Sequence, residues 1–155
     1  MERAEVSRST FYDHYRDVHE LAEAACTSMI DDLIGHVLSV DADASDEDPD
    51  PSLIAFFAHL ADHAGLYRAL LGPTGSARVI EHVRRRAAAA AHAWRHPAAG
   101  DEPEAFDVPA AFVAGALLSV AVDWLQRDCP GTAPEMTVLT KPLLRAVAAG
   151  DTKPK

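Results

Sequence analysis

Cysteine and aromatic residues are scarce in this chain of 155 residues. Its two cysteines, Cys26 and Cys129, cannot build a disulfide framework and lack the spacing of a zinc knuckle. Aromatic residues make up 6%, so the core must be built from aliphatic side chains and alanine. The longest run without charge, Val108 to Val122, is shorter than the roughly 18–20 residues of a membrane span. We therefore expect a soluble, cytoplasmic protein with no secretory leader and no membrane partner.

Basic residues are also in the minority, with 14 Lys and Arg against 24 Asp and Glu and a formal net charge of −10. Phosphate binding usually depends on Lys and Arg, so this balance argues against nucleic-acid binding by the whole surface. The acidic excess is concentrated in residues 41–50, however, while the first sixteen residues are balanced. The net charge therefore says little about the N-terminal segment.

Strand signals are almost absent, and helix start and stop signals recur along the chain. Asp17 with Glu20 and Thr132 with Glu135 have the form of capping boxes, and Asp50-Pro51 is typical of a helix start. The sequence therefore predicts an all-α fold. The expected helices cover about 7–14, 17–40, 51–61, 66–71, 76–94, 110–127 and 132–150.

The segment Val6-Ser-Arg-Ser-Thr-Phe-Tyr-Asp-His-Tyr15 combines a polar helix start with an aromatic back. Its first turn carries short hydrogen-bonding groups at a helix N-terminus, which favours anions, while Phe11 and Tyr15 can pack inward. A helix that enters the DNA major groove needs this combination, although a well-capped surface helix would show it too. The candidate DNA-binding residues are Ser7, Arg8, Ser9, Thr10, Tyr12, His14 and Tyr15.

This segment, followed by Glu20-Leu21, resembles the recognition helix and linker helix of the tetracycline-repressor (TetR) family of transcriptional regulators. The resemblance covers about residues 4–25. Gly65-Leu-Tyr-Arg-Ala-Leu-Leu-Gly72, with Trp124-Leu125, further resembles the ligand-binding half of a dihydroxyacetone-kinase-regulator-like branch. The resemblance implies a TetR-like helical bundle, a homodimer that binds operator DNA in the full-length protein, and an unknown small-molecule effector.

The chain departs from the family at its beginning, where members have further residues that form the first helix and most of the second. It also has Val18 where the family commonly has a lysine that reaches phosphate. We therefore expect an N-terminally truncated chain that binds operator DNA poorly. Residues 1–16 would be the remnant of a helix-turn-helix headpiece, 17–40 the linker helix, and 51–150 the ligand-binding and dimerisation domain.

The predicted helix 110–127 is apolar nearly all round, so it must be buried on more than one side. Small residues recur every four positions along it, where a second copy of the same helix could approach closely. In the family the last two long helices form the dimer interface, whereas a central core helix of a monomer would explain the pattern as well. The candidate dimer-interface residues are Ala111, Gly115, Ser119, Trp124, Leu139 and Leu143.

The large side chains of the body would line an apolar ligand pocket, although plain core is the more frequent role for each of them. The candidate ligand-binding residues are Phe56, Phe57, His59, Tyr67, Trp94 and Phe112.

The pairs His59/His63 and His92/His96 have metal-ligand spacing but no obvious third ligand, so we expect no metal and no cofactor. No catalytic constellation appears, and we expect no enzyme. The leading hypothesis is a ligand-responsive DNA-binding regulator, usually a repressor. The alternative is a dimeric helical ligand-binding or interaction module that does not touch DNA.

Overall fold

The computed structural model describes residues 8–37, 50–96 and 106–149, which contain six helices and no strand. The predicted all-α class is confirmed. The helices are α1 (Arg8–Val37), α2 (Pro51–Asp62), α3 (Ala64–Leu71), α4 (Ala77–Arg95), α5 (Val108–Gln126) and α6 (Ala133–Ala149). The expected end of the linker helix at Val40 and nearly all of the expected acidic loop 41–50 lie outside the described residues.

Three helix starts are fixed by side chains that accept hydrogen bonds from free backbone N–H groups. Asp50 caps α2 by accepting from the amides of Ser52 and Leu53, at 3.0 and 3.1 Å. Asp107 caps α5 in the same way, so this helix begins at Val108, two residues before the predicted start. The predicted capping box before α6 is present, because Glu135 Oε2 accepts from the Thr132 amide at 2.7 Å.

The predicted break between a short helix 7–14 and a linker helix beginning at Asp17 is wrong. α1 runs through Asp17 as one helix of 30 residues. The physical reason is that no glycine or proline occurs between Arg8 and Ile34, and Asp17 can form a cap only where something else ends the preceding helix.

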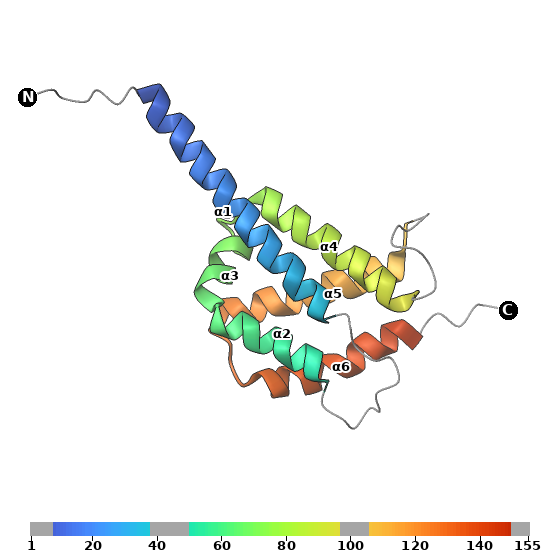
Figure 1. The fold of residues 1–155 in the computed structure, drawn as a ribbon. Helices are drawn as coiled ribbons and strands as arrows, with labels where there is room; N and C mark the ends of the chain where they lie inside the picture. Colours follow the sequence, from blue (N-terminus) through green and yellow to red (C-terminus); the bar gives the residue numbers. More distant parts are fainter. Residues whose placement is uncertain (1–7, 38–49, 97–105, 150–155) are drawn as a thin grey trace, which may run out of the picture.

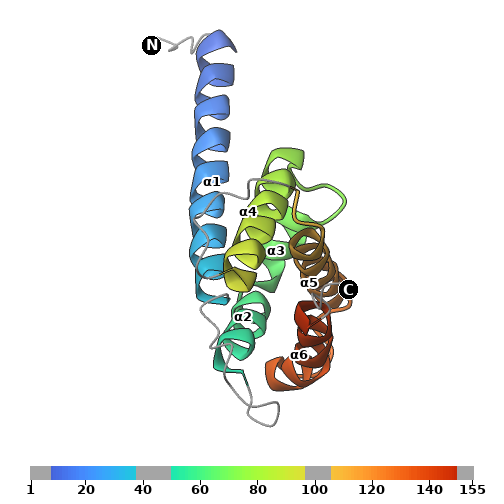
Figure 2. The same ribbon diagram turned by 90° about the vertical axis from the view of Figure 1, so that its right-hand side faces the viewer.

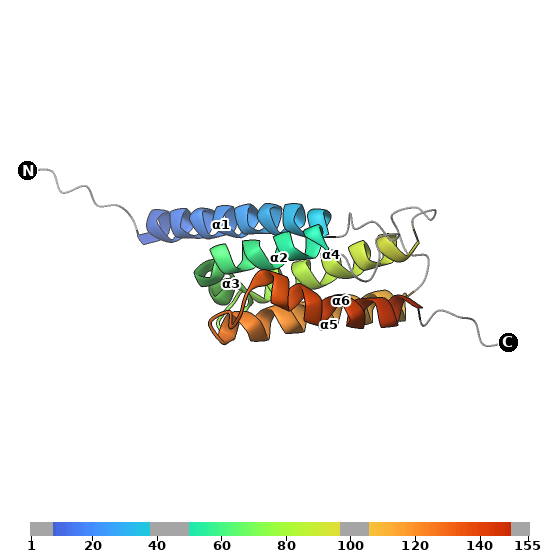
Figure 3. The same cartoon turned by 90° about the horizontal axis from the view of Figure 1, so that it is seen from below.

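The helices form three layers, which the two side views show from different directions (Figure 2, Figure 3). α1 forms one outer layer, α2, α3 and α4 form the middle layer, and α5 and α6 form the other outer layer. The C-terminal half of α1 packs against α4 and α2, and α5 lies along α4. The N-terminal half of α1 extends beyond the bundle (Figure 1).

The core lies where α2, α3, α4 and α5 meet below α1. Phe57 is fully buried, and its ring meets the ring of Trp124 edge to face at 5.4 Å between centroids. Trp124 also donates its indole N–H to the Pro130 carbonyl at 2.9 Å, which closes the turn between α5 and α6. Ile30 joins this core from α1 and anchors that helix to the bundle.

α5 has 19 residues and is long and apolar enough to cross a membrane by length and composition alone. The helix is longer than the charge-free run from Val108 to Val122, since it continues through Asp123 to Gln126. In the structure it packs against α4, α3 and α6. A single helix of this kind indicates a span only weakly, since core helices of soluble proteins pass the same test.

Candidate functional site

The N-terminal turns of α1 project away from the bundle as a continuation of a helix that is anchored in it (Figure 1, Figure 2). The described side chains on these turns, Thr10, Asp13, Arg16 and Glu20, are all exposed. Leu21 is 71% exposed, and α1 enters the core only from Met29 and Ile30 onwards. The projecting turns are therefore an accessible helical rod.

The candidate DNA-binding residues, except Ser7, belong to this projecting part of α1. Of their side chains the structure describes only Thr10, which is exposed. Ser7 lies outside the described residues, as do the side chains of Arg8, Ser9, Tyr12, His14 and Tyr15. Contact of these residues with DNA stays a prediction.

Two polar contacts fix α1 to α4 next to the projecting turns. Asp31 Oδ1 lies 2.8 Å from His82 Nε2 and accepts from Arg86 Nε at 3.0 Å. Closer to the N-terminus of α1, Glu23 accepts a hydrogen bond from the hydroxyl of Ser76, the residue directly before α4, at 2.6 Å. These contacts fix α1 to α4 directly before α1 leaves the bundle.

The electrostatics of the first contact favour an ionised carboxylate. Partial burial raises the pKa of Asp31, but hydrogen bonds and charge from His82 and Arg86 outweigh burial. The pKa of Asp31 is therefore lower than its usual value. The carboxylate stays negative at neutral pH, which keeps α1 fixed to the basic face of α4.

Between α1, α2, α4 and α5 lies an apolar cavity of about 60 Å³. Every lining side chain is apolar. The lining residues are Ile34 of α1, Phe56 of α2, Val83, Ala87 and Ala91 of α4, and Val113, Ala114, Leu117 and Leu118 of α5. A lining of this kind favours apolar molecules over water, because it offers water no hydrogen-bonding side chain.

The cavity exists because small residues line both helices where α4 and α5 run together. Ala87 and Ala91 stand four residues apart on α4, and Ala114 lines the same cavity from α5. Larger side chains at these positions would fill the space. These alanines were not among the predicted ligand-binding residues, although their four-residue spacing puts them on one face of the helix.

The structure places the candidate ligand-binding residues in several different environments. Phe56 lines the cavity, whereas Phe57 is part of the core beside it. Phe112 is 62% exposed and does not line the cavity, which differs from the prediction. Trp94 is half-buried, and its indole N–H has no hydrogen-bond partner among the described residues.

His59 and Tyr67 form a polar pair away from the cavity lining, with 3.0 Å between His59 Nε2 and the Tyr67 hydroxyl. Burial, then the charge of His63, hold the pKa of His59 below its usual value, although Asp62 opposes them. Burial, then the nearby Cys26, raise the pKa of Tyr67 to about 12. Both groups are therefore neutral at neutral pH, and the pair joins α2 to α3.

No family model, curated protein or solved structure matches the chain. The resemblance of residues 4–25 to the tetracycline-repressor family therefore stays a prediction, and so does the domain division drawn from it.

Apolar side chains are exposed along the outer layer formed by α5 and α6. On α5 one exposed stripe at helical spacing contains the apolar side chains of Val108 and Phe112, followed by the small residues Gly115 and Ser119. On α6, Val138, Leu139 and Leu143 are each about two-thirds exposed, at 66, 67 and 65%. Exposed apolar side chains that gather on one layer are typical of surfaces that contact a partner.

The candidate dimer-interface residues are divided between this surface and the core. Gly115, Ser119, Leu139 and Leu143 are exposed and Ala111 is half-buried, so all of them are at or near the surface. Trp124 is only 4% exposed and packs on Phe57, so its assignment to the interface differs from the structure. The reason is that α5 is apolar nearly all round, and its sequence alone does not tell which side faces inward.

Proposed function

We propose that this chain is the sensing and dimerising body of a ligand-responsive DNA-binding transcriptional regulator, together with part of its DNA-binding element. The proposal rests on one observation. A single continuous helix, α1, carries both candidate DNA-binding residues and a residue of the cavity wall. α1 begins with the segment that we propose to read the DNA groove, and 24 residues after Thr10 it contributes Ile34 to the cavity. At 1.5 Å per residue, these two points are about 36 Å apart along a rigid rod.

A ligand in the cavity would act on α1 directly. Ile34 of α1 and Val83 and Ala87 of α4 all line the space, so a molecule that fills it would push α1 away from α4. The contacts of Asp31 and Glu23 resist this movement and convert it into a tilt of the projecting turns. Coupling of about 1–3 kcal/mol between the two sites is enough for regulation.

The lining defines the chemistry of the effector. The cavity offers no polar side chain, so a charged or strongly polar group would lose its hydration without compensation. The effector is therefore a small molecule with an apolar part that enters between α4 and α5.

A second copy of the chain is the proposed partner at the outer layer. Gly115 and Ser119 are the small residues of the α5 stripe, so two copies of the helix can approach closely there, with the leucines of α6 beside them. A two-fold arrangement would present two α1 rods to successive major grooves of a near-palindromic site.

The proposal is tested by a gel-shift measurement with the complete reading frame and the DNA that flanks its gene, over a series of salt concentrations. We expect sequence-preferring binding that weakens with salt, and a loss of affinity in Arg8→Ala. Arg84→Ala is the matched control, because Arg84 is exposed on α4 and pairs with Glu81 on the same helix. No binding, or equal losses in both variants, would overturn the proposal.

The alternative, a dimeric ligand-binding or interaction module without DNA binding, is favoured by the net charge of −10. The same measurement separates the two functions. The alternative function requires two results together. The chain dimerises and binds apolar compounds, and the complete reading frame does not shift the flanking DNA even at low salt.

A further inference from the structure

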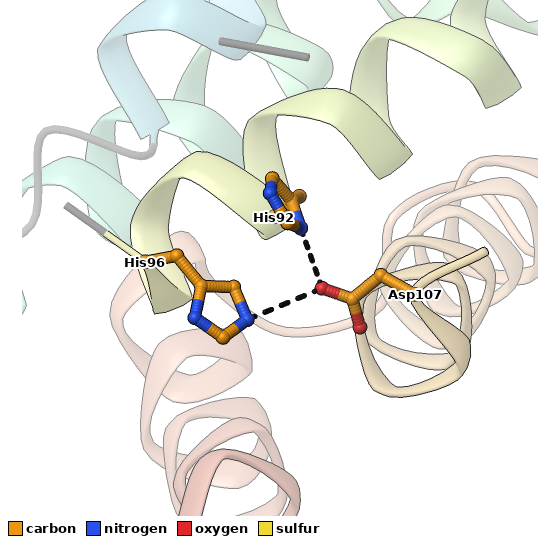
Figure 4. Close-up of side chains that lie close together, drawn as sticks. All are labelled: His92, His96 and Asp107. Atoms are coloured by element: carbon orange, nitrogen blue, oxygen red, sulfur yellow. Dashed lines mark hydrogen bonds and ion pairs between the residues drawn. The ribbon is translucent and has the colours of Figure 1, made fainter. Parts of the chain in front are cut away.

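His92 and His96 stand one turn apart at the C-terminal end of α4, and Asp107 stands directly before α5. The sequence offered this histidine pair no third ligand, but the fold supplies one. Because α4 and α5 pack side by side, the end of one helix meets the start of the other and brings the three side chains together (Figure 4). Both imidazole rings point toward the same carboxylate.

The distances suit a shared ion. Asp107 Oδ2 lies 2.6 Å from His92 Nδ1 and 3.4 Å from His96 Nε2, and one potential ligand atom from each residue lies within 4.8 Å of the others. Ligand atoms of a tetrahedral zinc ion, each about 2.0–2.1 Å from the metal, are about 3.3 Å apart. The contact between His92 and Asp107 must therefore open by about 0.7 Å, which rotation of an imidazole provides.

The carboxylate is already oriented for such a role. Its other oxygen, Oδ1, accepts from Arg95 Nη1 at 2.8 Å and from the Ala110 amide at 2.9 Å. Oδ2 is left facing the two histidines. Outer contacts of this kind fix a ligating carboxylate and contribute to metal affinity.

We propose that His92, His96 and Asp107 form a binding site for a divalent transition-metal ion of the zinc type. Two imidazole nitrogens and one carboxylate oxygen are the donors that zinc, nickel and cobalt take, whereas magnesium and calcium prefer oxygen ligands alone. Three protein ligands leave a coordination position for water. The charge of Arg95 opposes a second cation nearby, so the site binds reversibly rather than as a permanent structural centre.

The site lies where it can act on the cavity. His92 follows Ala91, which lines the cavity on α4, and Asp107 precedes α5, which forms another wall. A metal ion would clamp the end of α4 to the start of α5. The proposal does not depend on DNA binding, because the ion can be measured on the chain alone.

The test is a calorimetric titration of ZnCl₂ into the full chain free of any affinity tag, with Co²⁺ absorption in the visible range as the second readout. We expect one saturable site per chain, a tetrahedral Co²⁺ spectrum and a higher Tm with Zn²⁺. His96→Gln should weaken binding by more than the roughly 10–100-fold that loss of an outer contact costs. Asp107→Asn, which retains a capping side chain, should do the same.

His63→Gln is the matched control. His59 at the end of α2 and His63 directly after that helix have the same spacing, with 4.6 Å between ring centroids, but no described carboxylate completes a three-ligand group with them. This variant should bind Zn²⁺ like the unchanged chain. Absence of saturable binding in the unchanged chain, or equal affinity in His96→Gln, would overturn the proposal. Circular dichroism of each variant shows whether its fold is retained.

Discussion

Asp31 of α1 and His82 of α4 lie 2.8 Å apart between Oδ1 and Nε2, at the place where α1 is fixed to the bundle. Arg86 donates to the same oxygen, and the pKa of Asp31 is lowered as a result. A carboxyl group whose pKa is lower in the folded chain than in the unfolded chain stabilises the fold at higher pH. The stability that this contact contributes is therefore present at neutral pH and is lost in acid.

We expect Asp31→Asn to lower the free energy of unfolding by about 1 kcal/mol or less near pH 7, because the ion pairs are partly solvated. The difference should be fully present above the ordinary pKa of 3.8 and should vanish as the pH falls through the lowered value. Urea unfolding at a series of pH values measures it. Asp13→Asn, on the exposed projecting turns of the same helix, is the control and should show no such loss.

Tyr67 gives a second prediction from titration. Its side chain is 1% exposed, and its pKa is raised to about 12. Stability from the neutral phenol is complete below the ordinary pKa of 10 and is lost as the pH rises through about 12. In an ultraviolet absorbance titration, one of the three tyrosines should ionise near pH 12, and that step should be missing in Tyr67→Phe. Ionisation of all three near pH 10 would contradict the burial of this residue.

The helix starts were predictable because each depends on neighbouring residues. Asp50-Pro51 and the pair Thr132 and Glu135 contain both partners of the cap within four positions, and the structure has α2 and α6 beginning there. The break at Asp17 was not predictable in the same way. A capping residue starts a helix only where the preceding chain has already left the helical path, and α1 runs through Asp17 without a break.

The site was predictable only in part, since it depends on contacts between distant segments. The alanines of α4 indicate only a stable helix when the sequence is taken alone. That they line a cavity depends on Ala114, which α5 brings to the same space. His92 and His96 lack a third ligand until α5 brings Asp107 beside them. The inward and outward sides of α5 could not be told apart, which is why Phe112 and Trp124 were assigned to the wrong environments.

The cavity wall gives a third prediction, at Phe56. This ring is 9% exposed, lines the cavity and meets the ring of Phe57 at 5.2 Å between centroids. Phe56→Ala should destabilise the fold by about 3–5 kcal/mol, because it removes buried surface and enlarges an existing space. Urea unfolding measures the change. Phe106→Ala, at a residue that is 83% exposed, should stay within about 0.5 kcal/mol of the unchanged chain. Equal effects of the two changes would mean that Phe56 is not part of the packed wall.

The outer layer gives the last prediction, at Gly115. A Cβ atom built there meets nothing within 4 Å, so an arginine fits on a single subunit and disturbs only a partner. We expect Gly115→Arg to raise the dimer dissociation constant at least about 100-fold, because the charge would be buried against an apolar stripe.

Light scattering of the unchanged chain and of the variant measures this change. The molar mass in solution should fall from that of two chains to that of one chain. Gly65→Arg on α3 is the matched control, since this helical glycine also has nothing within 4 Å. Gly115 lies in the middle of α5, where a glycine costs about 0.5–1 kcal/mol relative to alanine, so we expect Gly115→Arg to retain its fold. A dimer that persists in Gly115→Arg, or that is lost equally in Gly65→Arg, places the contact between copies elsewhere than on α5.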